Sequence, residues 1–150
     1  MKKLLFFFLL LPFYAIAQED AQPIADADLI IVEAKGNPET ALKQLAMLMQ
    51  EKGYFIQDYN KELLNINATK ISNSSYALEV RVNAYIREKE KETFSIYVFG
   101  EYNYKNGEDE YHGRATFNNS LLRRLEKNAF EEIDKLIKAY PNGTVKYSKL

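Results

Sequence analysis

The feature that most constrains the fold of this chain is a strict alternation of apolar and polar side chains over residues 76–87. Every second residue of this segment is apolar: Tyr76, Leu78, Val80, Val82, Ala84 and Ile86. Polar or amphipathic residues stand between them: Glu79, Arg81, Asn83, Tyr85 and Arg87. Successive side chains of a β-strand point to opposite faces of its sheet, so the pattern predicts a strand with one face in the core and one in water. Such a strand is typical of an antiparallel sheet that is covered on one side.

The segments that follow predict a long hairpin beside this strand. Residues 93–105 place five large apolar side chains on one face: Phe94, Ile96, Val98, Tyr102 and Tyr104. Asn106-Gly107 favours a tight hairpin turn, after which residues 109–117 return as a strand. Three residues of the return strand are expected to point inward: Tyr111, Ala115 and Phe117. Gly100 interrupts the outgoing strand, which suggests a β-bulge there.

Three further strands are predicted nearer the N-terminus. Residues 28–33 form a β-branched apolar run, which is typical of a strand buried on both faces. Residues 54–59 and 63–70 read as two strands joined by a tight turn at Asn60-Lys61.

Helical spacing marks two other segments. Residues 38–52 predict a helix, because Asn37 can cap it, Pro38 fits its first turn and Gly53 can end it. Its apolar stripe is Ala41, Leu42, Leu45, Leu48 and Met49. A second helix is expected to open at Asn118 or Asn119 and to end at residues 141–143. Its apolar stripe is Leu122, Leu125, Ala129, Ile133, Leu136 and Tyr140.

The order of these elements predicts an α+β fold: a two-layer sandwich whose antiparallel sheet of about five to six strands carries two helices on one face. Residues 28–143 would form a single domain, and residues 144–150 a short tail, either extended or frayed. The centre of the core is expected to bring four strand residues against three helical ones: Val80, Val82, Ile96 and Val98 against Leu45, Leu125 and Ile133.

The element order also resembles that of a known group of domains. A helix opened by Asn37-Pro38-Glu39 and closed at Lys52-Gly53-Tyr54, before an extended segment, is similar to small exported domains of unknown function with a TBP-like βαβ4α fold from some Gram-negative envelopes. More loosely, the order resembles the helix-grip domains of the outer-membrane assembly lipoprotein BamC. The resemblance covers residues 28–140 and implies the fold, but it supplies no catalytic residues. The chain departs from the lipoprotein pattern because it has no lipobox cysteine.

The first seventeen residues read as an export signal. Lys2 and Lys3 precede an uninterrupted apolar run over residues 4–11 and an Ala-x-Ala cleavage motif. The residues of the expected cleavage site are Ala15, Ala17 and Gln18. The alternative is an uncleaved anchor, but the run is broken at Pro12 and is shorter than the roughly 20 residues of a spanning helix. Residues 18–27 would then form a flexible leader of a soluble periplasmic or secreted protein.

Composition excludes several kinds of protein. Removing the signal lowers the 20 basic residues to 18, against 21 acidic ones, so the mature chain lacks the basic excess of a nucleic-acid binder. The chain has no cysteine, which leaves its stability to packing and hydrogen bonds. No cofactor is indicated.

Catalytic signatures are sparse. His112 is the only histidine, so a site with several histidine ligands is excluded. No serine lies in the context of a known nucleophile motif. Carboxylates gather in three places, at residues 88–92, 108–110 and 131–134, where charged turns and an exposed helix face account for them. A glycosidase-type pair of carboxylates stays open, because it needs only spatial separation.

The outer face of the predicted sheet is the most informative surface. Strand parity puts three arginines, three aromatic residues and the histidine on it: Arg81, Tyr85, Arg87, Tyr97, Phe99, His112 and Arg114. Arginine and tyrosine are enriched in recognition surfaces. In the alternative interpretation the arginines only form cross-strand salt bridges, with Glu79, Glu101 and Glu110. We therefore expect a non-enzymatic module that binds an envelope protein, a peptide or a glycan, and a small hydrolase using carboxylates or His112 is the second hypothesis.

Overall fold

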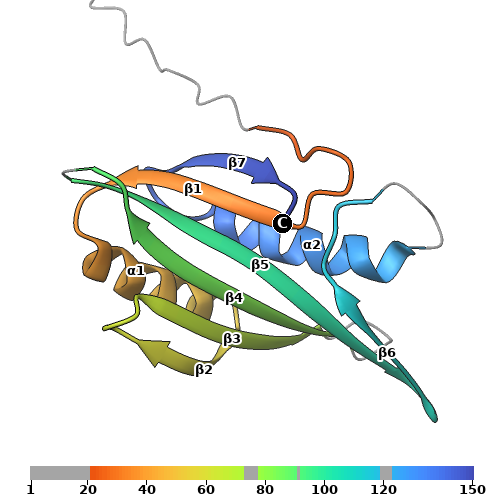
Figure 1. The fold of residues 1–150 in the computed structure, drawn as a ribbon. Helices are drawn as coiled ribbons and strands as arrows, with labels where there is room; N and C mark the ends of the chain where they lie inside the picture. Colours follow the sequence, from red (N-terminus) through yellow and green to blue (C-terminus); the bar gives the residue numbers. More distant parts are fainter. Residues whose placement is uncertain (1–20, 73–77, 91, 119–122) are drawn as a thin grey trace, which may run out of the picture.

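The structure, a computed structural model, describes residues 21–72, 78–90, 92–118 and 123–150 (Figure 1). Within these residues, seven strands and two helices follow one another: β1 (Leu29–Lys35), α1 (Pro38–Glu51), β2 (Phe55–Asn60), β3 (Asn65–Ser72), β4 (Leu78–Glu88), β5 (Thr93–Asn106), β6 (Asp109–Arg114), α2 (Arg124–Lys138) and β7 (Thr144–Ser148). This is an α+β fold, as the sequence predicts. Neither described helix is long and apolar enough to cross a bilayer.

The strands form one open antiparallel sheet in the order β2-β3-β4-β5-β1-β7. β6 stands off this path, because the first half of β5 pairs with β1 and the second half pairs with β6. β5 is therefore 14 residues long, and its far end projects with β6 as a hairpin at one corner of the sheet (Figure 1).

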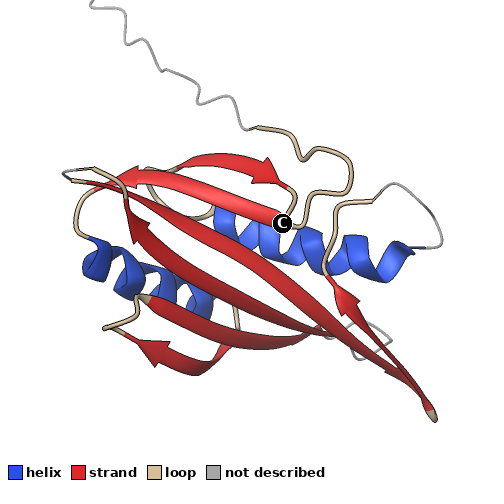
Figure 2. Ribbon diagram, viewed as in Figure 1, coloured by secondary structure: helices blue, strands red, loops and turns tan. Residues whose placement is uncertain are grey.

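Both helices lie on the same side of the sheet (Figure 2). α1 begins where expected, since the Asn37 side chain accepts a hydrogen bond from the Thr40 backbone N–H at 3.0 Å. It ends at Glu51, and Gly53 follows with a φ of +81°, a backbone conformation that favours glycine. α2 carries the wider buried stripe, which is Ala129, Phe130, Ile133, Leu136 and Ile137.

The core lies between this helical layer and the inner face of the sheet. The alternation along β4 is confirmed from Leu78 onward; Tyr76 falls outside the described residues. The four strand residues predicted at the centre of the core are all at most 1% exposed: Val80, Val82, Ile96 and Val98. Leu45 and Ile133 are equally buried against them, whereas Leu125 is only partly buried.

Four local expectations need correction. Gly100 is not a bulge, because it pairs in continuous register with Val82, and the irregular pairing falls instead between Ile56 and Asp58. Tyr111 is 51% exposed, since it lies on the projecting hairpin beyond the helices. Asn118 is not helical; α2 begins at Arg124, and residues 119–122, which include Leu122, lie outside the described part of the chain.

The fourth correction concerns the domain boundaries. Of the two states left open for residues 144–150, the structure has the extended one: Thr144–Ser148 is β7, an edge strand paired with β1, so the sheet continues past residue 143. At the other end, Ala27 was expected in the leader, yet it is fully buried and forms a bridge with Phe117. Both segments are held by pairing partners that are distant in the chain.

Candidate functional site

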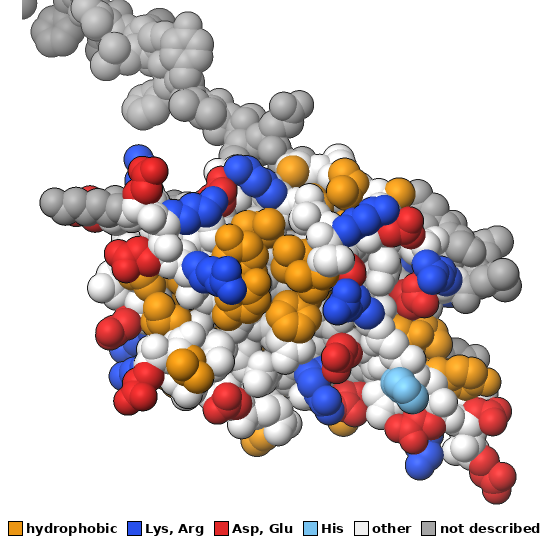
Figure 3. Space-filling view, in the orientation of Figure 1, with side chains coloured by type: hydrophobic (Ala, Val, Ile, Leu, Met, Phe, Trp, Pro, Cys, Tyr) orange, Lys and Arg blue, Asp and Glu red, His pale blue; other side chains and the backbone are white. Residues whose placement is uncertain are grey.

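All seven predicted surface residues lie on the face of the sheet that points away from the helices, which we call the open face. The strand register places them there, since Tyr85 pairs with Tyr97 and Glu101 pairs with both Arg81 and Arg114. Figure 3 looks onto this face and shows hydrophobic side chains near its centre, with charged side chains around them. The structure nevertheless divides the seven residues into two groups.

The first group is an aromatic cluster made by Tyr85, Tyr97 and Phe99. The two tyrosine rings stack with centroids 4.9 Å apart and an angle of 9° between their planes. Phe99 meets Tyr85 edge-on at 6.5 Å. The Arg87 guanidinium lies 5.2 Å from the Tyr85 ring centroid and 5.8 Å from that of Tyr97, within the range of a cation–π interaction.

The aromatic cluster extends onto β1 through Ile31, which pairs with Tyr97 and is half-buried. Leu29 lies two residues earlier on the same face and is 6% exposed. Sequence reasoning missed both residues as part of this surface, because a β-branched run was interpreted as a strand covered on both sides. We call the aromatic cluster together with Leu29 and Ile31 the apolar patch.

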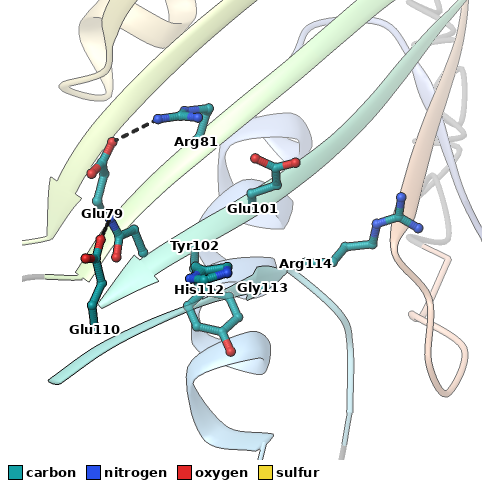
Figure 4. A pocket seen from close by; sticks show the side chains of 9 residues that line it. Glu79, Arg81, Glu101, Tyr102, Glu110, His112, Gly113 and Arg114 are labelled. Carbon is teal, nitrogen blue, oxygen red and sulfur yellow. Dashed lines mark hydrogen bonds and ion pairs between the residues drawn. The ribbon is translucent and has the colours of Figure 1, made fainter. Parts of the chain in front are cut away.

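The second group surrounds a pocket of about 440 Å³ at the base of the β5–β6 hairpin (Figure 4). Its lining includes three glutamates, two arginines and the histidine: Glu79, Glu101, Glu110, Arg81, Arg114 and His112. Arg81 reaches Glu79 with 3.7 Å between nitrogen and oxygen. Arg114 turns toward β1 and donates a hydrogen bond of 2.8 Å to Asp28.

The expected cross-strand salt bridges are thus formed only in part. Glu79 does bind an arginine, but along its own strand rather than across the sheet. Glu110 accepts a hydrogen bond from the Asn103 side chain at 2.9 Å. Glu101 has no ion pair among the residues that the structure describes, although Arg81 and Arg114 flank it in register.

A second ionic group borders the other end of the apolar patch. Lys89 and Lys146 both donate hydrogen bonds to the Glu33 carboxylate. Hydrogen bonds from Lys146 and then Lys89 hold the pKa of Glu33 below its ordinary value, against a smaller opposing effect of desolvation. These two lysines and Arg87 give this end of the open face a local positive excess.

The carboxylates singled out on the second helix are used in ion pairs. Glu131 pairs with Lys127, Glu132 with Lys70 and Asp134 with Lys138. His112 is exposed on β6. Within the described ranges, no group of three or more His, Cys, Asp or Glu side chains is placed to hold a metal ion.

Comparison with known proteins does not assign the chain to a family. The chain matches no protein-family model, and no curated protein is significantly similar to it in sequence. The open face itself is therefore the basis for an assignment of function.

Proposed function

We propose that this protein is a non-enzymatic interaction module that binds its partner through the open face of the sheet. The observation that carries the proposal is the apolar patch, in which stacked tyrosines and an arginine lie together on the face of the sheet opposite to the two described helices. Tyrosine, phenylalanine and arginine supply large contact area and hydrogen bonding with little loss of side-chain entropy. The partner would be an envelope protein, a peptide or a glycan.

The proposal includes export of the protein. Residues 1–17 carry the charged, apolar and Ala-x-Ala regions of a signal peptide. The mature chain would begin at Gln18 and act in the periplasm or outside the cell. Mass spectrometry of the exported protein should give a chain that starts at residue 18, and recovery of the uncut chain from the inner membrane would contradict the location.

A binding experiment tests the assignment of the face. We expect the double substitution Arg87→Ser and Tyr97→Ser to abolish capture of the partner from an envelope extract by the immobilised protein. Lys43→Ser with Met47→Ser is the matched control, because both residues are exposed on α1, on the other side of the molecule. An identical set of captured partners for all three proteins would remove the open face from consideration.

The second candidate is a small hydrolase, and the pocket beside the hairpin favours it, since it gathers His112 with three glutamates. Two features weigh against it: Glu79 is held by Arg81, and Glu110 already accepts a hydrogen bond from Asn103. A screen of the purified protein against esterase, glycosidase and peptidase substrates separates the two functions. Hydrolysis that disappears with His112→Ala would reverse our ranking.

A further inference from the structure

We propose that the open face binds a chain of uncharged sugars, in a polar groove that crosses the strands from β2 to β6 beside the apolar patch. The inference rests on the proposed function, in that it takes the open face to be the interaction surface. It goes further by choosing the glycan among the three kinds of partner that the function leaves open, and by naming the side chains that would hold it.

The groove consists of two hollows that adjoin on the open face. One is the pocket of about 440 Å³ at the base of the β5–β6 hairpin, and the other is a hollow of about 500 Å³ nearer to β2. Both are lined by Glu79, Arg81 and Glu101. The combined lining runs over five neighbouring strands, from Gln57 on β2 to His112 on β6. Four strand spacings of about 4.8 Å make the groove about 19 Å long, which suits several sugar rings in a row.

The hollow nearer to β2 has a lining that is polar and largely uncharged. Four of its side chains carry an amide or a hydroxyl group: Gln57, Asn67, Thr69 and Asn83. None of these four side chains has a hydrogen-bond partner among the residues that the structure describes. Amide and hydroxyl groups both donate and accept hydrogen bonds, as the hydroxyl groups of a sugar do. The unused capacity of this lining therefore fits a ligand that carries hydroxyl groups on all sides.

Glu101 supplies a free acceptor where the two hollows meet. It rises from β5 between Arg81 and Arg114, and both guanidinium groups turn away from it (Figure 4). Arg81 lies 3.7 Å from Glu79, and Arg114 donates a hydrogen bond of 2.8 Å to Asp28. Glu101 thus keeps both carboxylate oxygens available within the described part of the chain. Two such oxygens can accept hydrogen bonds from neighbouring hydroxyl groups of one sugar ring.

Aromatic rings border the groove at β2 and at β5. Phe55 pairs with Thr69, so it lies on the open face at the β2 end, where it is 71% exposed. Phe99 lines the hollow nearer to β2 and belongs to the apolar patch. The face of an aromatic ring carries partial negative charge, which attracts the weakly positive C–H groups on the face of a sugar ring. Rings beside a row of polar side chains thus match the apolar face and the polar rim of a sugar.

Two observations favour uncharged sugars over other occupants of the groove. The central strands beneath it, β3, β4 and β5, pair on both sides, so they offer no free backbone to an extended peptide, which commonly binds by adding a strand to a sheet edge. In the pocket at the hairpin, three glutamates outnumber two arginines, and Asp28 already binds one of these arginines. The lining therefore disfavours ligands that carry phosphate or carboxylate groups.

Isothermal titration calorimetry of the purified protein tests the proposal with a panel of short oligomers. The uncharged probes are linear hexasaccharides of glucose, mannose and N-acetylglucosamine, and the charged probes are hexagalacturonic acid and a hexalysine peptide. We expect an uncharged hexasaccharide to bind more tightly than either charged probe.

Substitutions in the groove should weaken that binding. Glu101→Ala should lower the affinity about tenfold or more, because it removes a charged acceptor. Phe55→Ala should lower it about threefold to tenfold through lost stacking. Glu51→Ala and Met47→Ala are the matched controls, since both residues are exposed on α1, on the other side of the molecule, and they should leave the affinity unchanged.

Backbone amide NMR of the unaltered protein covers the case in which a substitution disturbs the fold. Adding the hexasaccharide that binds most tightly should shift the signals of the groove most and those of α1 least. The signals to follow are those of Thr69, Asn83, Glu101 and His112, one on each strand from β3 to β6. Shifts confined to another surface would overturn the assignment of the groove.

The outcomes separate the sugar site from the proposed function. No binding of any uncharged hexasaccharide, tighter binding of a charged probe, or equal losses in the Glu101→Ala and Glu51→Ala proteins would overturn the sugar site. If the Arg87→Ser, Tyr97→Ser protein nevertheless loses its captured partner, the open face binds a protein or a peptide and only the sugar site is wrong. If sugar binding is absent and that capture is also unchanged, both proposals fail together.

Discussion

The covered face and the open face of the sheet are made by the same strands, yet different interactions stabilise them. Along β4, the inward residues from Leu78 to Ile86 are all buried, whereas Arg81 and Arg87 on the other side are exposed. The inner face is an apolar core, and the open face is a mixture of stacked rings and ion pairs. The alternation along the strands decides which face is apolar, and the helices then exclude water from that face.

Tyrosines make the comparison clear, because they occur on both faces. Tyr54 is 4% exposed beneath the helical layer, and burial, with a further effect from the Glu132 carboxylate, raises its pKa well above the ordinary value. Tyr85 and Tyr97 on the open face instead keep part of their surface in water. The same side chain therefore contributes to core packing on one face and to a partly exposed aromatic cluster on the other.

The largest expected effect is the loss of core packing on the covered face. Ile96→Ala should lower the free energy of unfolding by about 2 to 4 kcal/mol, because it removes buried methyl groups and leaves a cavity. Glu79→Ala, on the open face of β4, should change it by less than about 0.5 kcal/mol. Urea unfolding measures both, and equal effects at the two positions would break the division between the faces.

A somewhat smaller loss of stability is expected from a substitution that tests how closely α2 approaches the covered face. A Cβ atom at Gly100 would lie 2.1 Å from Cδ1 of Ile133 and 2.8 Å from the Arg81 carbonyl oxygen. Gly100→Ala should therefore cost about 1 to 3 kcal/mol through overpacking. Ile133→Val removes the clashing methyl group, so the double variant should be more stable than the sum of the single effects indicates. Strict additivity would mean that the helix does not rest on this glycine.

The smallest expected losses of stability are those of two carboxylate substitutions, one at the margin of each face. Desolvation by itself would raise the pKa of Glu132, but hydrogen bonds and charge from Lys70 and Lys135 outweigh it and hold the pKa below the ordinary value of 4.5. This contribution to stability is present above pH 4.5 and is lost as the pH falls through the lowered pKa. Glu132→Gln should thus cost about 1 kcal/mol at pH 7 and progressively less in acid.

The dependence of unfolding on salt concentration gives a second comparison of carboxylates on the two faces. Glu33→Gln on the open face breaks two exposed ion pairs, with Lys89 and Lys146, which water and salt screen. Its effect on unfolding should therefore be smaller than that of Glu132→Gln and should shrink further in high salt. Urea unfolding of both variants across pH and ionic strength measures the difference. An equal response to salt would mean that Glu132 is as well solvated as Glu33.

Local signals account for the parts of the fold that the sequence predicted well. The limits of α1 followed from Asn37 and Gly53, which act within one turn of the helix. The turn at Asn106-Gly107 followed from a residue pair suited to positive φ, and Gly107 adopts a φ of +64°. Strand parity then brought all seven candidate residues to one face, because a period of two residues needs no knowledge of the partner strand.

Contacts between distant segments account for what the sequence did not predict. Nothing in the sequence of β5 indicates that its first half pairs with β1 and its second half with β6. β7 became a strand because β1 offers it an unpaired edge, and Gly100 is required because Ile133, on α2, lies over it. The ion pairs also differ from those expected: Arg114 binds Asp28, which is 86 residues away in the chain.

The sequence by itself determined which residues share a face, where the first helix begins and ends, and that a mixed aromatic and arginine surface exists. These properties depend on side-chain periodicity and on capping groups within a few residues of one another. Only the tertiary structure decided that Leu29 and Ile31 extend the aromatic cluster, and that Arg87 and Glu101 stand without ion pairs among the described residues at its two ends. Strand order and register set those relations, and they arise from hydrogen bonds and packing between segments far apart in the chain.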